Sequence, residues 1–182
     1  HCDRVMAAPS AGVTTPLPDI LPRRIAAEGP ISFAAYMGEC LLHPEHGYYR
    51  SQEAIGLGGD FTTAPEISQM FGELLGLWAA DYWQRMGAPQ RCYLVELGPG
   101  RGTLMRDALR AAQALPPFRA AVSPVLVEAS QRLIDMQRKT LAGENPEWLA
   151  SVASLPTDAP LIVLANEFLD ALPVRQFQRG DD

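Results

Sequence analysis

The spacing of apolar residues changes along the chain, from helical steps in the first half to short strand-like runs in the second. In the first half, steps of three and four residues predict three helices, at residues 19–28, 33–42 and 64–86. Asp19 and Ser32 are the expected N-caps of the first two helices. Residues 43–60 show no clear period, so we expect an ordered loop there.

The third predicted helix is long and amphipathic, and it ends at Gly87. Thr63 and Glu66 have the spacing of a capping box, in which each side chain accepts a hydrogen bond from an exposed backbone N–H. The residues expected on its buried face share one stripe of the helix: Phe71, Leu74, Leu75, Trp78 and Tyr82.

The second half alternates apolar runs with amphipathic segments. We expect strands at residues 92–97, 124–128 and 161–165, a short one near 149–152, and helices at 103–112 and 130–141. This alternation is typical of an α/β fold with a parallel, Rossmann-like sheet covered by helices on both faces. A sheet of three or four strands would leave an apolar edge open, so the sequence suggests an incomplete domain in which residues 174–178 begin another strand.

These elements divide the chain into a disordered tail (1–18), a helical N-terminal region with a glycine-rich loop (19–88) and an incomplete α/β domain (89–182). A chain of 182 residues with 47% hydrophobic and 20% charged residues is ordinary for one soluble globular domain. The net charge of −6 argues against nucleic acid as a partner. The 3 cysteines form no C-x-x-C pair, which indicates a reducing compartment, and no apolar run is long enough for membrane insertion.

The sequence Val-Glu-Leu-Gly-Pro-Gly-Arg-Gly follows the first predicted strand and precedes a helix. A strand, a glycine turn and a helix form a cradle for a nucleotide, because glycine allows a sharp turn and close approach of the backbone to the ligand. Here the glycines are Gly98, Gly100 and Gly102, and Glu96 ends the strand before them. Thr103 stands where a dehydrogenase fingerprint has its third glycine, so the spacing favours S-adenosylmethionine over NAD.

Two further segments extend this candidate cofactor site. Glu128 ends the second predicted strand, the position at which an acid accepts hydrogen bonds from ribose hydroxyls. In the loop before the long helix, Gly59 allows close backbone approach and Asp60 can face a cationic cofactor.

Four ordered motifs carry a resemblance to a known family. They are His43-Pro-x-x-Gly-Tyr-Tyr49, Gly58-Gly-Asp-Phe-Thr-Thr-Ala-Pro-Glu66, Phe71-Gly-Glu-Leu-Leu75 and Ala165-Asn-Glu-Phe-Leu-Asp-Ala-Leu-Pro-Val174. With the glycine turn and Glu128, they resemble the MidA-type class I S-adenosylmethionine-dependent methyltransferases, which are related to a mitochondrial complex I assembly factor that methylates arginine. The resemblance covers residues 24–179 and the N-terminal half of a typical member.

The resemblance implies methyl transfer to an arginine of a protein, which could be a subunit of a respiratory complex. Asn166, Glu167 and Asp170 follow the last predicted strand, at the sheet end where α/β proteins bind ligands. We expect Glu167 to pair with the target guanidinium, Asn166 to orient it and Asp170 to support them; the alternative is that the three cap the next turn. The family also suggests that the loop 58–66 closes over the cofactor.

Other functions remain open from the sequence. A cofactor-binding assembly chaperone without essential turnover is the main alternative, and an NAD-dependent oxidoreductase is a weaker one. His43 and His46 have no further ligands at usable spacing, so we expect no metal site. Nothing resembles a transit peptide, which favours the bacterial cytoplasm, or the mitochondrial matrix if the source is eukaryotic. The sequence leaves the oligomeric state undetermined.

Overall fold

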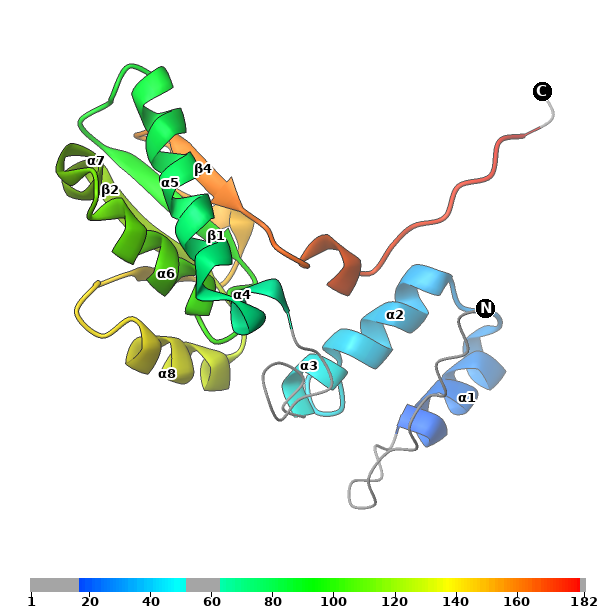
Figure 1. Ribbon diagram of the computed structural model, residues 1–182. Coiled ribbons are helices and arrows are strands. Elements are labelled where there is room, and N and C mark those ends of the chain that lie inside the picture. Colours follow the sequence, from blue (N-terminus) through cyan, green and yellow to red (C-terminus); the bar gives the residue numbers. More distant parts are fainter. Residues whose placement is uncertain (1–16, 52–62, 181–182) are drawn as a thin grey trace, which may run out of the picture.

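The computed structural model describes residues 17–51 and 63–180 (Figure 1). The N-terminal region contains α1 (Leu17–Glu28), α2 (Phe33–Leu42), α3 (Tyr48–Ser51), α4 (Ala64–Ile67) and α5 (Gln69–Arg85). The α/β region contains β1 (Cys92–Leu97), α6 (Thr103–Ala112), α7 (Pro116–Ala121), β2 (Val122–Val127), α8 (Gln131–Thr140), β3 (Glu147–Leu149) and β4 (Leu161–Leu164), with short 3-10 turns η1 (Val152–Ser154) and η2 (Leu169–Ala171).

The strands form one parallel sheet in the order β3-β2-β1-β4, which confirms the expected α/β class. The chain moves outward from β1 through β2 to β3 and then returns to the other side of β1. The neighbours β1 and β4 are in register with Val95 opposite Val163. Their carboxyl ends therefore flank the point at which the strand order reverses, where open α/β sheets bind ligands.

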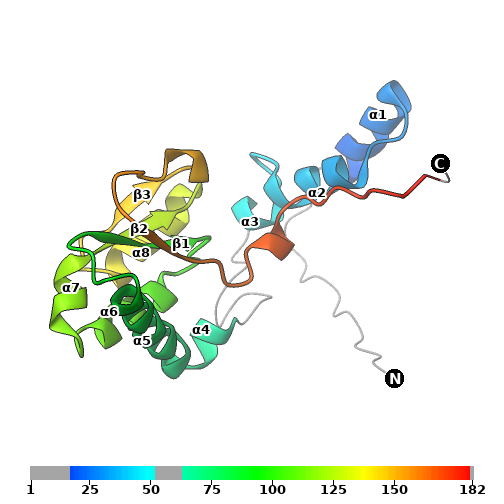
Figure 2. The same ribbon diagram turned by 90° about the horizontal axis from the view of Figure 1, so that it is seen from above.

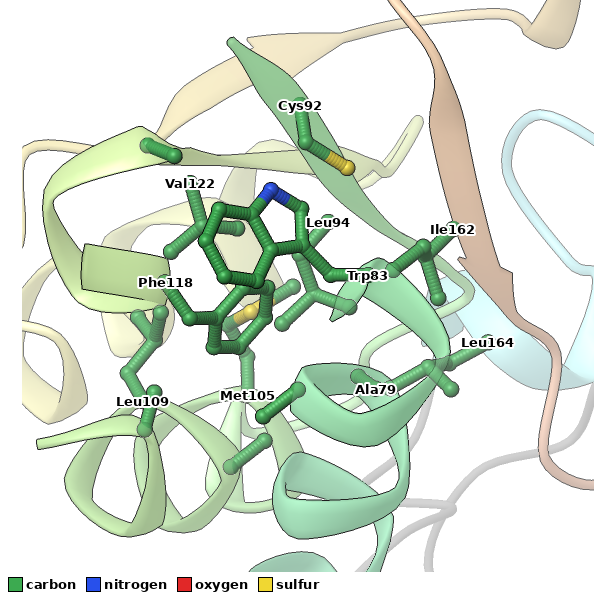
Figure 3. Close-up of a cluster of buried hydrophobic side chains, with 14 of the residues drawn as sticks. Ala79, Trp83, Cys92, Leu94, Met105, Leu109, Phe118, Val122, Ile162 and Leu164 are labelled. Carbon is green, nitrogen blue, oxygen red and sulfur yellow. The ribbon is translucent and has the colours of Figure 1, made fainter. Parts of the chain in front are cut away.

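Helices α5, α6 and α7 pack together on one face of the sheet (Figure 2). The core beneath them is centred on Trp83, which contacts Phe118 with ring centroids 5.6 Å apart and donates from Nε1 to the Pro89 carbonyl at 2.9 Å (Figure 3). Cys92 and Leu94 of β1 enter the same cluster, since alternate residues of a strand share a face. This layer is the hydrophobic core that holds β1 and its glycine turn in place.

The expectation of helices on both faces is wrong for the described residues. The opposite face, which carries Val95 and Val125, packs against Leu155 and Ala159 of the segment that joins β3 to β4. On this side Val163 of the edge strand β4 keeps 44% of its surface exposed. The alternating sequence pattern cannot distinguish a helix from an irregular segment that covers the same apolar face.

The long helix predicted at 64–86 is interrupted, and its buried face matches the expected one only in part. Ser68 adopts an extended conformation between α4 and α5, and α5 ends at Arg85. The buried positions of α5 are largely small: Gly72, Gly76, Ala79, Ala80 and Trp83. Of the expected residues, Phe71 and Leu75 are partly buried against the core, whereas Leu74, Trp78 and Tyr82 lie exposed.

Close contact between α5 and α6 explains this choice of face. A Cβ placed on Gly76 would lie 2.4 Å from the Ala108 carbonyl oxygen, and one on Gly72 would lie 2.7 Å from Asp107 Cβ. Two glycines one turn apart thus allow the backbones to approach more closely than any larger side chain would permit. The stripe of large residues could not replace them without separating the two helices.

Several boundaries also differ from the expectations. Helix α1 begins at Leu17, so Asp19 lies in its first turn, and residues 17 and 18, which were expected in the tail, are helical. Ser32 caps α2 as expected, and accepts a hydrogen bond from Ala35 N at 3.2 Å.

The segments expected as loops and strands also differ in part. The expected loop 43–60 contains α3, and the residues around Pro116 form α7 directly before β2. Strand β3 precedes the expected position, and residues 174–178 pair with no strand of the described chain.

Within residues 17–51 and 63–180, no helix combines the length and apolar character needed to cross a bilayer.

Candidate functional site

The turn after β1 adopts the backbone conformation that its glycines predict. Gly98, Gly100 and Gly102 have φ angles of 62°, 53° and 80°, in the left-handed region that disfavours residues with a Cβ. The turn closes with a hydrogen bond from Gly102 N to Pro99 O at 2.7 Å. Gly102 is the N-cap of α6, so the turn presents backbone N–H groups at an electropositive helix start.

Glu96 lies at the end of β1 with only 4% of its surface exposed. Its Oε2 is buried and has no hydrogen-bond partner among the described residues. Burial raises the pKa of this carboxyl from 4.5 to about 8, although a backbone hydrogen bond from Met105 acts in the opposite direction. The strand therefore ends in an acid that is held largely protonated and lacks a partner, an environment typical of functional carboxyls.

Replacement of Glu96 by glutamine is expected to stabilise the ligand-free protein increasingly as the pH rises from about 4.5 to about 8. The folded state keeps the Glu96 proton across this window while the unfolded chain loses it, so wild-type stability falls by up to about 1.4 kcal/mol per pH unit. Glutamine has no such proton. Urea unfolding of both proteins at pH 5, 7 and 9 measures the effect, and a stability difference that is equal at all three values would contradict it.

Glu128 follows β2 and is held by neighbouring donors. Its Oε1 accepts from Ser130 N at 2.8 Å, and its Oε2 accepts from Gln137 Nε2 at 3.4 Å. Burial raises the pKa of Glu128, and these hydrogen bonds oppose the rise. A carboxylate has about four acceptor positions, so this arrangement leaves acceptors for further hydroxyl donors.

The residues after β4 lie beside the glycine turn. Phe168 contacts Gly98 closely: a Cβ on Gly98 would lie 2.7 Å from Phe168 Cδ2. The structure therefore brings together the ends of β1 and β4, as the sequence predicts, but the residue that contacts the turn is Phe168. The chain then runs toward α2, where a Cβ on Gly38 would lie 3.8 Å from Pro173 Cγ (Figures 1 and 2).

Asn166, Glu167 and Asp170 are placed together on this segment. Asn166 is half-buried, while Glu167 and Asp170 are exposed. Glu167 has a φ of 47°, a strained value for a residue with a Cβ. The 3-10 turn η2 has Phe168 as its N-cap and no side-chain cap, so the alternative that these residues serve as caps is not supported there.

Tyr49 of α3, the last residue of the first family motif, also lies near this segment. Its pKa is raised, first by burial and then by the negative charges of Asp170 and Glu167. The phenol therefore lies close enough to both carboxylates to sense their charge. A T-shaped contact with the Tyr48 ring, with centroids 5.3 Å apart, orients it.

Thr103 and Glu66 form a second unanticipated contact. Thr103 Oγ1 donates to Glu66 Oε1 at 2.7 Å, and Thr63 makes no side-chain cap bond. The expected capping box is wrong because Glu66 instead accepts from this hydroxyl of α6. The contact joins α4 to the helix that begins at the glycine turn.

Gly59 and Asp60 lie outside the described residues. His43 Nδ1 accepts from Glu45 N and His46 N at 3.2 Å each, which assigns it to the local turn. The described part of the chain contains no group of three or more His, Cys, Asp or Glu residues arranged to hold a metal ion.

Comparisons with known proteins show the family to which the chain is similar. The family model described as "Putative S-adenosyl-L-methionine-dependent methyltransferase" matches residues 74–182. The chain is 40% identical to the mitochondrial protein arginine methyltransferase NDUFAF7 of Danio rerio, over 89% of this chain and 44% of the relative. It is also 40% identical to the human protein of that name, over 94% of this chain and 44% of the relative.

A solved structure is also similar to this chain in fold and sequence. A Burkholderia thailandensis protein crystallised with S-adenosyl-homocysteine superimposes with a TM-score of 0.72 and 32% identity, over 86% of this chain and 42% of that one. The chain thus spans less than half the length of the relatives it matches.

Proposed function

Because the chain belongs to the family of S-adenosyl-L-methionine-dependent methyltransferases, we propose that it forms the cofactor-binding part of an enzyme that methylates arginine in a protein. The named relatives are protein arginine methyltransferases, which supports arginine as the acceptor. The motifs also resemble a family tied to complex I assembly, which favours a respiratory-complex subunit as the substrate. The observation that carries the proposal is the glycine turn after β1, at the β1–β4 switch point. Glu96 lies at the end of β1, and Glu128 follows the neighbouring strand β2.

The residues present fit S-adenosylmethionine. The glycine turn offers backbone N–H groups and close approach, and Glu128 has acceptors left for the two ribose hydroxyls. Glu96 Oε2 is a buried oxygen without a partner, and a bound cationic group would favour the ionised form of this carboxyl and pair with it. When bound, the cofactor supplies a methyl group on a positively charged sulfur.

The residues after β4 are suited to the acceptor. A guanidinium is always charged and presents N–H donors in a plane, so it needs carboxylates to orient it. Glu167 and Asp170 supply two, and the Asn166 amide can fix the orientation. Methyl transfer needs the nucleophilic nitrogen in line with the sulfur–methyl bond, so positioning is their main task.

The compartment is proposed from the same relatives. These are mitochondrial proteins, which suggests the mitochondrial matrix for a eukaryotic source and the cytoplasm for a bacterial one. Both are reducing compartments, in which the described cysteines Cys40 and Cys92 would stay free as they are in the structure.

Calorimetry with S-adenosylmethionine and NAD, side by side, tests the cofactor assignment. We expect the chain to bind S-adenosylmethionine and S-adenosylhomocysteine, and to bind NAD at least about tenfold more weakly because Thr103 replaces the third dehydrogenase glycine. Gly100→Val is the matched variant and should remove binding, since φ is 53° there. Binding of NAD alone would overturn the proposal.

A further inference from the structure

Gln137 of α8 is a polar residue in the hydrophobic interior. It has 0% of its surface exposed and lies one turn from the buried Leu133 and Leu141 on the same helix face. Burial of an amide is costly unless its donors and acceptor are paired, so this residue needs specific partners.

The partners of Gln137 come from three different parts of the sheet. Its Nε2 donates to Gly100 O at 2.8 Å, in the glycine turn after β1. The same nitrogen lies 3.4 Å from Glu128 Oε2, after β2. Its Oε1 accepts from Nε1 of Trp148 in β3 at 2.9 Å.

These contacts constrain the orientation of the Glu128 carboxylate. Ser130 N fixes one oxygen and Gln137 Nε2 approaches the other, so both oxygens are held from the protein side. The same amide nitrogen donates to the Gly100 carbonyl and so fixes the orientation of the peptide unit between Gly100 and Arg101 in the turn. One side chain therefore couples the conformation of the turn to the orientation of the acid.

Packing reinforces this coupling. A Cβ on Gly102 would lie 3.4 Å from Gln137 Cγ, so the side chain also touches the end of the glycine turn. No other residue type offers a neutral donor pair and an acceptor at this length: glutamate would place a second carboxyl beside Glu128, and methionine would pair with none of the three groups.

We propose that Gln137 is a positioning residue of the cofactor site, which orients the Glu128 carboxylate toward a ribose 2′,3′-diol and fixes the glycine turn in the matching conformation. The inference rests on the proposed function, since it assumes that this site binds an adenosyl cofactor. It adds a residue on α8 to a site otherwise built from the loops after the strands.

Gln137→Met tests the role, because methionine has similar length and volume but no amide. The probes are S-adenosylhomocysteine and its 2′-deoxy analogue, titrated by calorimetry into wild type and variant. We expect the variant to bind S-adenosylhomocysteine about tenfold more weakly, and to bind the 2′-deoxy analogue with less than about a threefold change, because the lost interaction acts through the diol. The preference for the ribose diol therefore shrinks.

Trp148→Phe is the matched control. It removes the donor to Gln137 Oε1 and leaves the two contacts of Nε2, so it should lower thermal stability without changing the preference for the diol. If Gln137→Met does not fold, Gln137→Glu keeps an acceptor for Trp148 and serves in the same comparison.

The outcomes separate this inference from the proposed function. Equal weakening of both ligands in the Gln137 variant, or no weakening, would overturn the positioning role while wild-type binding still supports the function. An equal loss of the diol preference in Trp148→Phe would likewise overturn it. Failure of the wild-type chain to bind S-adenosylhomocysteine would overturn the proposed function and this inference with it.

Discussion

Trp83→Ala is expected to lower the free energy of unfolding by about 3–5 kcal/mol. The Trp83 side chain is 5% exposed and packs at the centre of the core between α5, α7 and the sheet (Figure 3). Truncation removes its contact with Phe118 and leaves the Pro89 carbonyl without its donor. Urea unfolding followed by circular dichroism measures the loss.

Trp78→Ala on the same helix is the control. Trp78 is 48% exposed and stacks on Tyr82 with ring centroids 5.6 Å apart, so its loss should cost less than about 1 kcal/mol. Equal destabilisation by the two variants would show that Trp78 is buried as deeply as Trp83, which would contradict the described face of α5.

The sequence pattern predicts the buried face of α5 only in part, since Phe71 and Leu75 pack against the core but Leu74, Trp78 and Tyr82 do not. The size and hydrophobicity of residues such as Leu74 and Trp78 favour burial, and the helical period is correct. The closest approach of α5 to α6 instead requires glycine at 72 and 76, where even one methyl group would meet the backbone of α6. A pattern of large apolar residues identifies an amphipathic helix but not the distance at which its neighbour packs.

The parts of the cofactor site that depend on backbone conformation could be predicted. Glycines at alternate positions after an apolar run predict a turn with positive φ angles, and the φ angles of Gly98, Gly100 and Gly102 confirm this prediction. The alternation of strands and helices predicts a parallel sheet, which the structure confirms, while the position of β4 beside β1 was not predicted. The predicted features follow from local residue types and from the rules of connection.

The side-chain contacts of the site could not be predicted, because they join residues far apart in sequence. Thr103 and Glu66 meet across α4 and α6, and Phe168 lies against Gly98. Gln137 gave one signal that could have been used: it is a polar residue on the apolar stripe of an amphipathic helix, where burial demands partners. An interpretation based on hydrophobic periodicity alone treats such a polar residue as a mismatch and does not look for its partners.

The strained backbone at Glu167 connects the fold to the proposed chemistry. A φ of 47° at a residue with a Cβ costs about 1–2 kcal/mol, and such strain is often found at functional sites. The segment that imposes it also places Phe168 against the glycine turn and Asp170 near Tyr49. We infer that this geometry holds the carboxylates where an arginine can reach the transferred methyl group.

Glu167→Gln in the full-length protein is therefore expected to reduce methyl transfer by about 10²-fold or more, with the dissociation constant of S-adenosylmethionine unchanged. The amide keeps the shape of the side chain but removes the charge that pairs with the guanidinium. The measurement is transfer of labelled methyl groups to a hypomethylated cell extract, read as methylarginine after acid hydrolysis. Glu147→Gln, at an exposed acid of the edge strand β3, carries the same charge change away from the site and should leave transfer intact. Unchanged turnover in Glu167→Gln would remove this carboxylate from the mechanism, and a loss of cofactor binding would place it in the cofactor site instead.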